Sequence, residues 1–144
     1  MGMNCMTAQK KKLYKHLDRS IYCRLGVSPV HGIGVFAIRA IPKGTHPLQT
    51  MSSPKEIKFT RKEIDQLPKS VREQIKIFCY CYKDEVRVSS MGLNTMDIAF
   101  YLNHSKKPNL RMKKNGDFET LRNIRAGEEL MMDYDHSFGE KHVF

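Results

Sequence analysis

Short stretches in which apolar and polar residues alternate recur along this chain. An alternation with a period of two is typical of β-strands that bury one face. The stretches that we predict as strands are Ile21–Val27, Val35–Ile41, Ile77–Tyr82 and Glu85–Ser89. Turn signals rich in Pro, Gly and Asp separate these stretches. The pattern therefore predicts a fold of many short strands.

A hairpin is predicted near the C-terminal end by one dipeptide. Asn115-Gly116 lies between the apolar runs Leu110–Met112 and Phe118–Leu121. Asn-Gly between two such runs is a strong hairpin signal, because both residues tolerate the positive φ angles of a tight turn.

Residues 60–78 have the helical period instead. Thr60 and Glu63 have the spacing of one capping box, and Ser70 and Glu73 have that of another, with a proline between the two pairs. We therefore predict a two-helix insert. Further along, Asn94 can cap a short helix that runs through residue 98 towards residue 103. The fold class that follows is a small, β-rich α+β fold.

Length and composition allow one globular domain without a membrane span. The chain has 144 residues, 40% of them apolar, and no apolar stretch long enough to cross a bilayer. The start of the chain lacks the apolar core of a signal peptide, so we expect an intracellular protein. The cysteines, Cys5, Cys23, Cys79 and Cys81, have neither zinc spacing nor the density of a disulfide scaffold. We expect them to be reduced and packed as small apolar residues, with Cys79 and Cys81 on one face of a strand.

The chain is strongly basic, with 25 Lys and Arg against 15 Asp and Glu and a net charge of +10. Part of this charge lies in residues 1–19, which we expect to form a basic arm or a short helix. Such a segment is a weak signal for nuclear targeting or nucleic-acid binding, and a solvated basic terminus is the favoured interpretation. Direct nucleic-acid binding therefore stays open.

Three sequence motifs, in order, carry a resemblance to a known family. They are Gly32-Ile33-Gly34, then Asn103-His104-Ser105 with Pro108-Asn109, and then Glu129-Leu130-Met131-Met132-Asp133-Tyr134. Together they resemble a SET domain, most closely the minimal viral-type SET proteins that lack a post-SET zinc module. The resemblance implies a β-rich SET fold over residues 20–138, with an insert at about 52–90, a C-terminal pseudoknot and a tail at 139–144.

The resemblance also implies a cofactor, S-adenosylmethionine, with S-adenosylhomocysteine as product and no metal. Gly32, Ile33 and Gly34 are expected to contact its methionine part, because glycines let a ligand approach the backbone closely. Asn103 and His104 are expected to hold its amino end and adenine. A dinucleotide site is not expected, since the third glycine of that fingerprint is missing.

Tyr134 is the expected catalytic residue and a further cofactor contact. The resemblance places its hydroxyl where a substrate lysine meets the methyl sulfonium. Met132 and Phe138 are expected to line the lysine channel, although Met132 fits ordinary core packing equally well. Glu128 and Glu129 are not expected to form an acid/base pair, because adjacent strand residues point to opposite faces.

The chain departs from the family pattern at several places. Phe100 and Lys106 stand where an arginine and a cysteine are often found around the Asn-His-Ser motif, and Thr45–Leu48 replaces a tyrosine, a glycine and an acidic residue. No cysteine cluster follows Tyr134. Either the last ten residues or a second subunit must then close the substrate channel, so a homodimer is one of two alternatives and rests on the resemblance alone.

The leading hypothesis is a protein-lysine N-methyltransferase that acts on a histone tail or on another lysine-containing protein. A basic tail needs a locally acidic groove, for which Asp133, Asp135 and Glu140 are candidates. A non-catalytic SET-like binding module is the main alternative, and a basic nucleic-acid-binding domain is the third. The expected location is the nucleus in a eukaryote, and otherwise the cytoplasm or a host cell.

Overall fold

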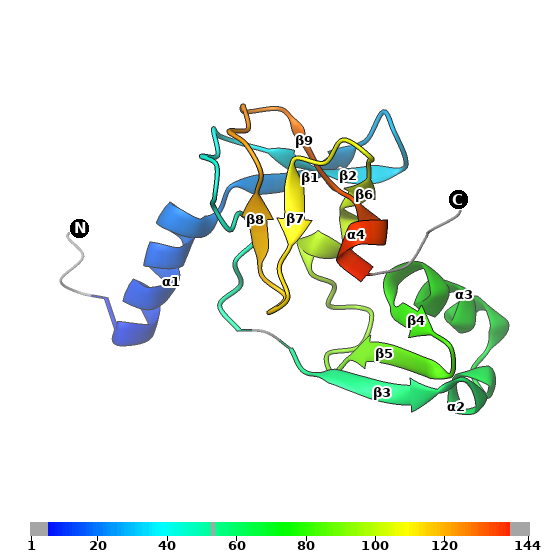
Figure 1. The fold of residues 1–144 in the computed structure, drawn as a ribbon. Coiled ribbons are helices and arrows are strands. Elements are labelled where there is room, and N and C mark those ends of the chain that lie inside the picture. Colours follow the sequence, from blue (N-terminus) through cyan, green and yellow to red (C-terminus); the bar gives the residue numbers. More distant parts are fainter. Residues whose placement is uncertain (1–5, 53, 139–144) are drawn as a thin grey trace. The chain divides into compact units, whose positions relative to one another are not determined.

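The chain forms two compact units, which are described separately. One comprises residues 1–51 and 101–144, and the other residues 52–100. The computed structural model describes residues 6–52 and 54–138, with side chains up to His136, and Figure 1 shows the elements. Cys5, Glu140 and the 139–144 tail lie outside the described residues. The domain boundaries given above stay predictions.

The first unit is built on one mixed sheet. Its strands are β1 (Cys23–Val27), β2 (Ile33–Ala37), β6 (Asn103–His104), β7 (Leu110–Met112), β8 (Phe118–Thr120) and β9 (Glu129–Met132). The order is β1-β2-β9-β7-β8, and β6 pairs with β9 as well. The pairs β1 with β2, β2 with β9, and β7 with β8 are antiparallel, whereas β6 and β7 both run parallel to β9. The last strand of the chain is therefore central to the sheet.

The core of this unit comes from alternate positions of its strands. In β9, Leu130 and Met132 are buried while Glu129 and Met131 are only partly covered. The buried apolar residues of the unit are Val35, Ala37, Ile41, Leu48, Leu102, Leu110, Ile124, Leu130 and Met132. The predicted hairpin is confirmed: β7 and β8 pair across a turn in which Gly116 has φ +88°.

A short helix precedes this sheet in the chain. Helix α1 (Ala8–Ser20) begins after Thr7, whose side chain accepts a hydrogen bond from the Lys10 amide. None of its residues is buried. Among the described residues, no helix of either unit has the length and apolarity needed to cross a membrane.

The second unit contains a three-stranded antiparallel sheet and two helices. The strands are β3 (Glu56–Thr60), β4 (Tyr80–Tyr82) and β5 (Glu85–Ser89), in the order β3-β5-β4, and the helices are α2 (Arg61–Asp65) and α3 (Lys69–Phe78). Ile64, Ile75 and Val86 form its buried cluster, against which Cys79 and Cys81 pack. Burial raises the pKa of the Cys79 thiol to about 11. Cys79 and Cys81 are thus packed as predicted, but of these two only Cys81 lies in a strand.

The first predicted capping box is present at the start of α2. The Glu63 amide donates to Thr60 Oγ1 at 3.2 Å, and the Thr60 amide donates to Glu63 Oε2 at 2.8 Å.

Thr60→Ala is expected to lower the free energy of unfolding by about 1 kcal/mol, the usual cost of a lost N-cap. Denaturant titration measures this loss. Ser70→Ala, inside α3, is the matched control and should change stability by less than about 0.5 kcal/mol.

Two predictions about α3 and the strand that follows it are wrong. Ser70 does not cap α3, because the helix already begins at Lys69 and Pro68 is its N-cap without a side-chain bond. The strand predicted from Ile77 begins only at Tyr80, since the Cys79 amide still donates to the Ile75 carbonyl at 2.9 Å and continues the helical pattern. The helical hydrogen bonds override the local alternation here.

The short helix after residue 94 also differs from the prediction. It is a 3₁₀ turn, η2 (Ile98–Tyr101), and Asp97 rather than Asn94 caps it, with Asp97 Oδ1 accepting from the Ala99 amide at 2.9 Å. Strand β3 is not among the strands predicted from the sequence. All five of its residues are exposed, so no burial pattern marks it.

Candidate active site

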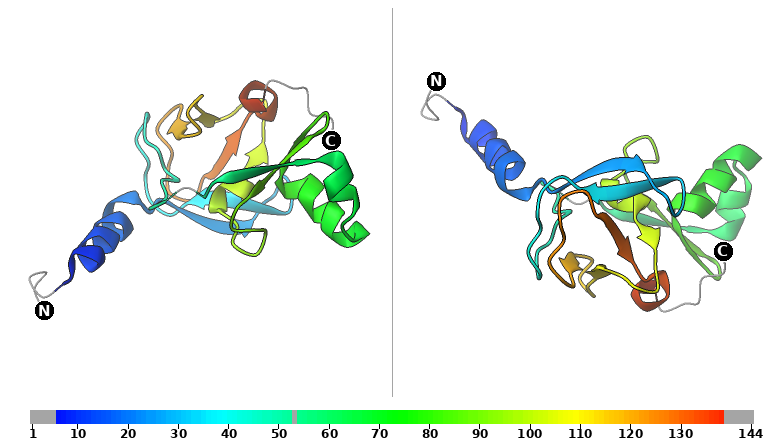
Figure 2. Two further views of the ribbon diagram at one scale, coloured as in Figure 1. Left: turned by 90° about the horizontal axis from the view of Figure 1, so that it is seen from below. Right: turned by 90° about the horizontal axis from the view of Figure 1, so that it is seen from above.

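The parallel pairing of β6 with β9 brings two of the sequence motifs together. Asn103 lies beside Met131 and His104 beside Met132, and the Ser105 amide donates to the Met132 carbonyl at 3.0 Å. Both views in Figure 2 show β9 running next to β6 and β2. The Asn-His-Ser motif and the C-terminal motif thus form one site in the first unit.

The side chain of Asn103 hydrogen-bonds to residues 28–34, a segment that contains Gly32 and Gly34 and is called the glycine loop here. Asn103 is buried, and Nδ2 donates to the carbonyls of His31 at 3.0 Å and Ile33 at 3.3 Å and to Glu129 Oε1 at 2.9 Å. All three partners are acceptors, so the orientation of the amide is determined. Oδ1 is consequently the atom of Asn103 that can accept a hydrogen bond from a ligand.

The two glycines of the loop are needed for different reasons. Gly32 has φ +50°, which favours glycine, and a Cβ added there would meet nothing within 4 Å. The backbone at Gly32 is therefore open to a ligand. At Gly34 an added Cβ would lie 2.2 Å from Glu129 Oε1, so Gly34 makes room for that carboxylate. The third predicted residue, Ile33, offers its backbone between them.

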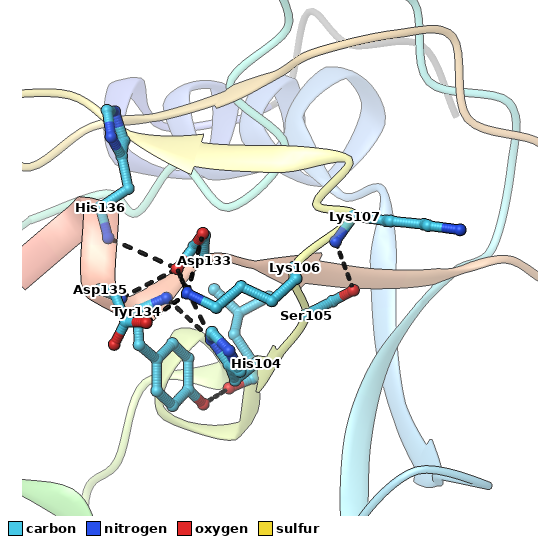
Figure 3. Close-up of polar contacts among 9 residues, drawn as sticks. His104, Ser105, Lys106, Lys107, Asp133, Tyr134, Asp135 and His136 are labelled. Carbon is cyan, nitrogen blue, oxygen red and sulfur yellow. Dashed lines mark hydrogen bonds and ion pairs between the residues drawn. The ribbon is translucent and has the colours of Figure 1, made fainter. Parts of the chain in front are cut away.

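Tyr134 lies next to His104, as Figure 3 shows. Its hydroxyl donates to the Leu102 carbonyl, and its amide donates to His104 Nδ1 at 3.0 Å. The two ring centroids are 5.3 Å apart. Burial raises the pKa of Tyr134 above its usual value, so the phenol stays protonated at neutral pH. A phenol that stays protonated is not a base, and it can donate or accept hydrogen bonds.

His104 has two contacts that demand opposite protonation states of Nδ1. The Tyr134 amide at 3.0 Å needs an acceptor, whereas an ion pair with Asp133 Oδ1 at 3.9 Å needs a protonated ring. We favour the first, because a hydrogen bond at 3.0 Å is well within range and the longer contact is not. His104 then carries its proton on Nε2.

Two carboxylates flank the start of α4 (Tyr134–Phe138), and a lysine joins them. Lys106 Nζ lies 3.3 Å from Asp133 Oδ1 and also contacts Asp135 (Figure 3). Hydrogen bonding to Asp135, with a smaller contribution from Asp133, raises the pKa of Lys106. His104, Asp133 and Asp135 have ligand-type atoms within 4.8 Å of one another. Since Lys106 already compensates these carboxylates, we assign no metal to them, and the absence of a metal stays a prediction.

Asn109 is a site residue to which the sequence analysis gave no role. It is buried, its Nδ2 donates to the Glu129 carbonyl at 2.8 Å, and its Oδ1 accepts from the Met131 amide at 2.9 Å. The side chain thus makes the two hydrogen bonds with β9 that the backbone of a paired strand would make. Asn109 lies in the segment of the chain between β6 and β7. Its place at the end of the Asn-His-Ser motif is the only sequence signal for this role.

Replacing Asn109 with alanine is expected to destabilise the protein by about 2–4 kcal/mol, because the partly buried Glu129 carbonyl and Met131 amide lose their partners. Chemical denaturation followed by circular dichroism measures the loss. Asn94→Ala, at an exposed position, serves as control and should be near neutral. Equal stabilities of the two variants would show that Asn109 does not hold β9.

The structure separates the adjacent acidic residues as predicted, although Glu128 lies in the turn before β9 and not in the strand itself. Glu128 binds Arg122 at 2.8 Å and the Arg125 amide at 2.9 Å, whereas Glu129 faces Asn103. Met132 is buried with the core, which supports its packing interpretation, and its channel role stays a prediction. Phe138 ends α4, and its side chain lies outside the described part.

Comparison with family models identifies the chain. The model of the SET domain matches residues 32–135, a range that includes Gly32-Ile33-Gly34, the Asn-His-Ser motif and Tyr134. The chain belongs to the SET domain family. SET domains are lysine methyltransferases as a class, so membership supports a methyltransferase activity in general. The viral-type subclass stays a prediction.

Solved structures support the same fold. A crystal structure of a Plasmodium falciparum "putative histone methyltransferase" is similar, with a TM-score of 0.52 and 19% identity over 83% of this chain and 98% of that one. At this identity the likeness concerns the fold alone. It confirms the predicted α+β SET fold of short sheets and few helices. Comparison with curated protein sequences finds no match.

Proposed function

We propose that this SET domain is an S-adenosylmethionine-dependent protein-lysine N-methyltransferase. The observation that supports this most is the arrangement around β6 and β9, in which Asn103 is fixed against the glycine loop and Tyr134 against the Leu102 carbonyl. A cofactor-binding group and an orienting hydroxyl are thus held by the same pair of strands.

The residues of the loop fit the methionine part of the proposed cofactor. Its amino group is a donor, which matches Oδ1 of Asn103 and backbone carbonyls, and its carboxylate accepts from backbone amides. The open backbone at Gly32 lets such a ligand approach without a Cβ in the way. When bound, S-adenosylmethionine supplies an electrophilic methyl group on a positively charged sulfur, and S-adenosylhomocysteine is the product.

Tyr134 is proposed to orient the substrate lysine. A hydroxyl that donates its proton to the Leu102 carbonyl keeps oxygen lone pairs that can accept from an amine. The lysine nitrogen must be neutral to attack, although its pKa in water is about 10.4. An apolar channel and a nearby positive charge both lower that value. Alignment of the nitrogen with the methyl carbon then provides much of the rate enhancement.

The substrate is proposed to be a histone tail or another basic protein segment. Asp133 and Asp135 are the acidic residues on either side of Tyr134, but Lys106 already pairs with both. A basic substrate residue would have to compete with that lysine. A homodimer that completes the lysine channel, and a nuclear location in a eukaryote, are further proposals that rest on family analogy.

Transfer of labelled methyl from S-adenosylmethionine to core histones and to a cell lysate tests the proposal. We expect label in at least one protein band. Folded protein that binds the cofactor without labelling any protein would be a non-catalytic module. Without cofactor binding, and with affinity for DNA that falls steeply with salt, the basic nucleic-acid-binding domain would be the better description.

A further inference from the structure

Glu129 stands at the centre of the hydrogen bonds that hold the glycine loop. Its Oε1 accepts from Asn103 Nδ2 at 2.9 Å, and its Oε2 accepts from Ser28 Oγ at 3.0 Å. We propose that Glu129 is a positioning residue for cofactor binding, whose carboxylate fixes Asn103 and the loop of residues 28–34 relative to each other. This inference rests on the proposed function.

Ser28 extends the effect of this carboxylate into the loop. It is buried, and its Oγ accepts from the amides of Val30 at 3.0 Å and His31 at 3.2 Å. The Ser28 amide also donates to the Gly32 carbonyl at 2.8 Å. The hydroxyl that organises the turn therefore has its own orientation fixed by Glu129.

Asn103 completes the connection from the other side. The same nitrogen that donates to Glu129 also donates to the carbonyls of His31 and Ile33. Glu129 thus reaches the loop by two routes, through Ser28 at its start and through Asn103 at its end. The direction of Asn103 Oδ1, the atom proposed to receive the cofactor's amino group, depends on this arrangement.

The position requires a group that only accepts hydrogen bonds. Ser28 Oγ already accepts from two backbone amides, so it can only donate to residue 129, and Asn103 Nδ2 can only donate. A carboxylate satisfies both neighbours at once. An amide would have to present its own NH₂ group to one of these donors. Glu129→Gln therefore changes the shape of the side chain little but removes one of its two hydrogen bonds, either that from Ser28 or that from Asn103.

The chain offers a matched control next to this residue. Glu128 has the same side chain, lies one position earlier, just before β9 begins, and binds Arg122 and the Arg125 amide. Its carboxylate makes no described contact with the loop of residues 28–34. Glu128→Gln should therefore leave cofactor binding unchanged.

Calorimetry of S-adenosylhomocysteine and steady-state methyl transfer test the inference. For Glu129→Gln we expect Kd for S-adenosylhomocysteine and KM for the cofactor to rise about tenfold, equal to about 1.4 kcal/mol. The value of kcat at saturating cofactor should stay within about twofold of wild type, because the reacting groups are untouched. A reduced kcat with unchanged Kd would indicate loss of folded enzyme only and would overturn the inference.

Ser28→Ala gives a second test if Glu129→Gln does not fold. It removes the hydrogen bond from residue 28 to Glu129 and also the acceptor of the Val30 and His31 amides, so Kd should rise by at least about threefold to fivefold. Unchanged Kd in both folded variants would overturn the inference while the proposed function stands. Folded wild-type protein that binds no S-adenosylhomocysteine would overturn both.

Discussion

Tyr134→Phe is expected to lower kcat for methyl transfer at least about hundredfold, the loss that misplacement of a reacting group by about 1 Å can cause. The hydroxyl is fixed by its bond to the Leu102 carbonyl, and the substituted ring keeps its place beside His104. Single-turnover transfer to the best-labelled protein measures the change. The affinity for S-adenosylhomocysteine should stay within a few-fold, because Asn103 and the glycine loop are intact.

Tyr22→Phe is the control for the loss of a tyrosine hydroxyl. Tyr22 belongs to the same unit, and its ring lies 4.3 Å from the guanidinium carbon of Arg39. Phenylalanine keeps that ring, so Tyr22→Phe should retain wild-type kcat. If Tyr134→Phe were as active as the control, Tyr134 would not be the orienting group, and the catalytic assignment would have to move to another residue.

Features that depend on residues close in sequence were predictable. The Asn115-Gly116 hairpin and the Thr60 capping box each rest on a few neighbouring residues, and both are present. Glu128 and Glu129 bind different partners, as expected, but Glu128 belongs to the turn before β9, so alternation along the strand does not explain this separation. Local hydrogen bonds decide the hairpin and the capping box whatever the rest of the chain does.

Features that depend on distant partners were not predictable from the pattern. Strand β6 has only two residues, and only its parallel partner β9 makes it a strand. The family resemblance, and not periodicity, led to the expectation that Asn103 and Tyr134 meet. The roles of Asn109 and Ser28 depend on β9 as well, and no local pattern of apolar and polar residues marks them. The pseudoknot itself stays a prediction, although both β6 and β7 pair with β9.

Gly34→Ala is expected to weaken both stability and cofactor binding. The new Cβ would lie 2.2 Å from Glu129 Oε1 and 3.1 Å from Ser28 Cβ. The carboxylate cannot simply turn away, because Asn103 and Ser28 both donate to it. Overpacking of this kind costs about 1–3 kcal/mol in unfolding free energy. Denaturation gives the stability, and calorimetry should show S-adenosylhomocysteine affinity reduced by at least about tenfold.

The glycine at position 32 provides the contrast. Gly32→Ala meets no atom within 4 Å, so its cost in stability should come from the positive φ alone, about 1 kcal/mol. If Gly34→Ala were no more destabilising than Gly32→Ala, the close packing of Gly34 on Glu129 would not be a constraint on this fold.

A double-mutant cycle then separates the clash from other effects of the methyl group. Glu129→Ala removes the atom that the Gly34 methyl would meet, so adding Gly34→Ala to that variant should cost much less than adding it to wild type. The expected coupling is about 1–2 kcal/mol, within the range for residues in contact. Additive losses would mean that alanine at position 34 acts through the strand backbone. A strong coupling would instead show that glycine is needed at position 34 because the Glu129 carboxylate lies against it.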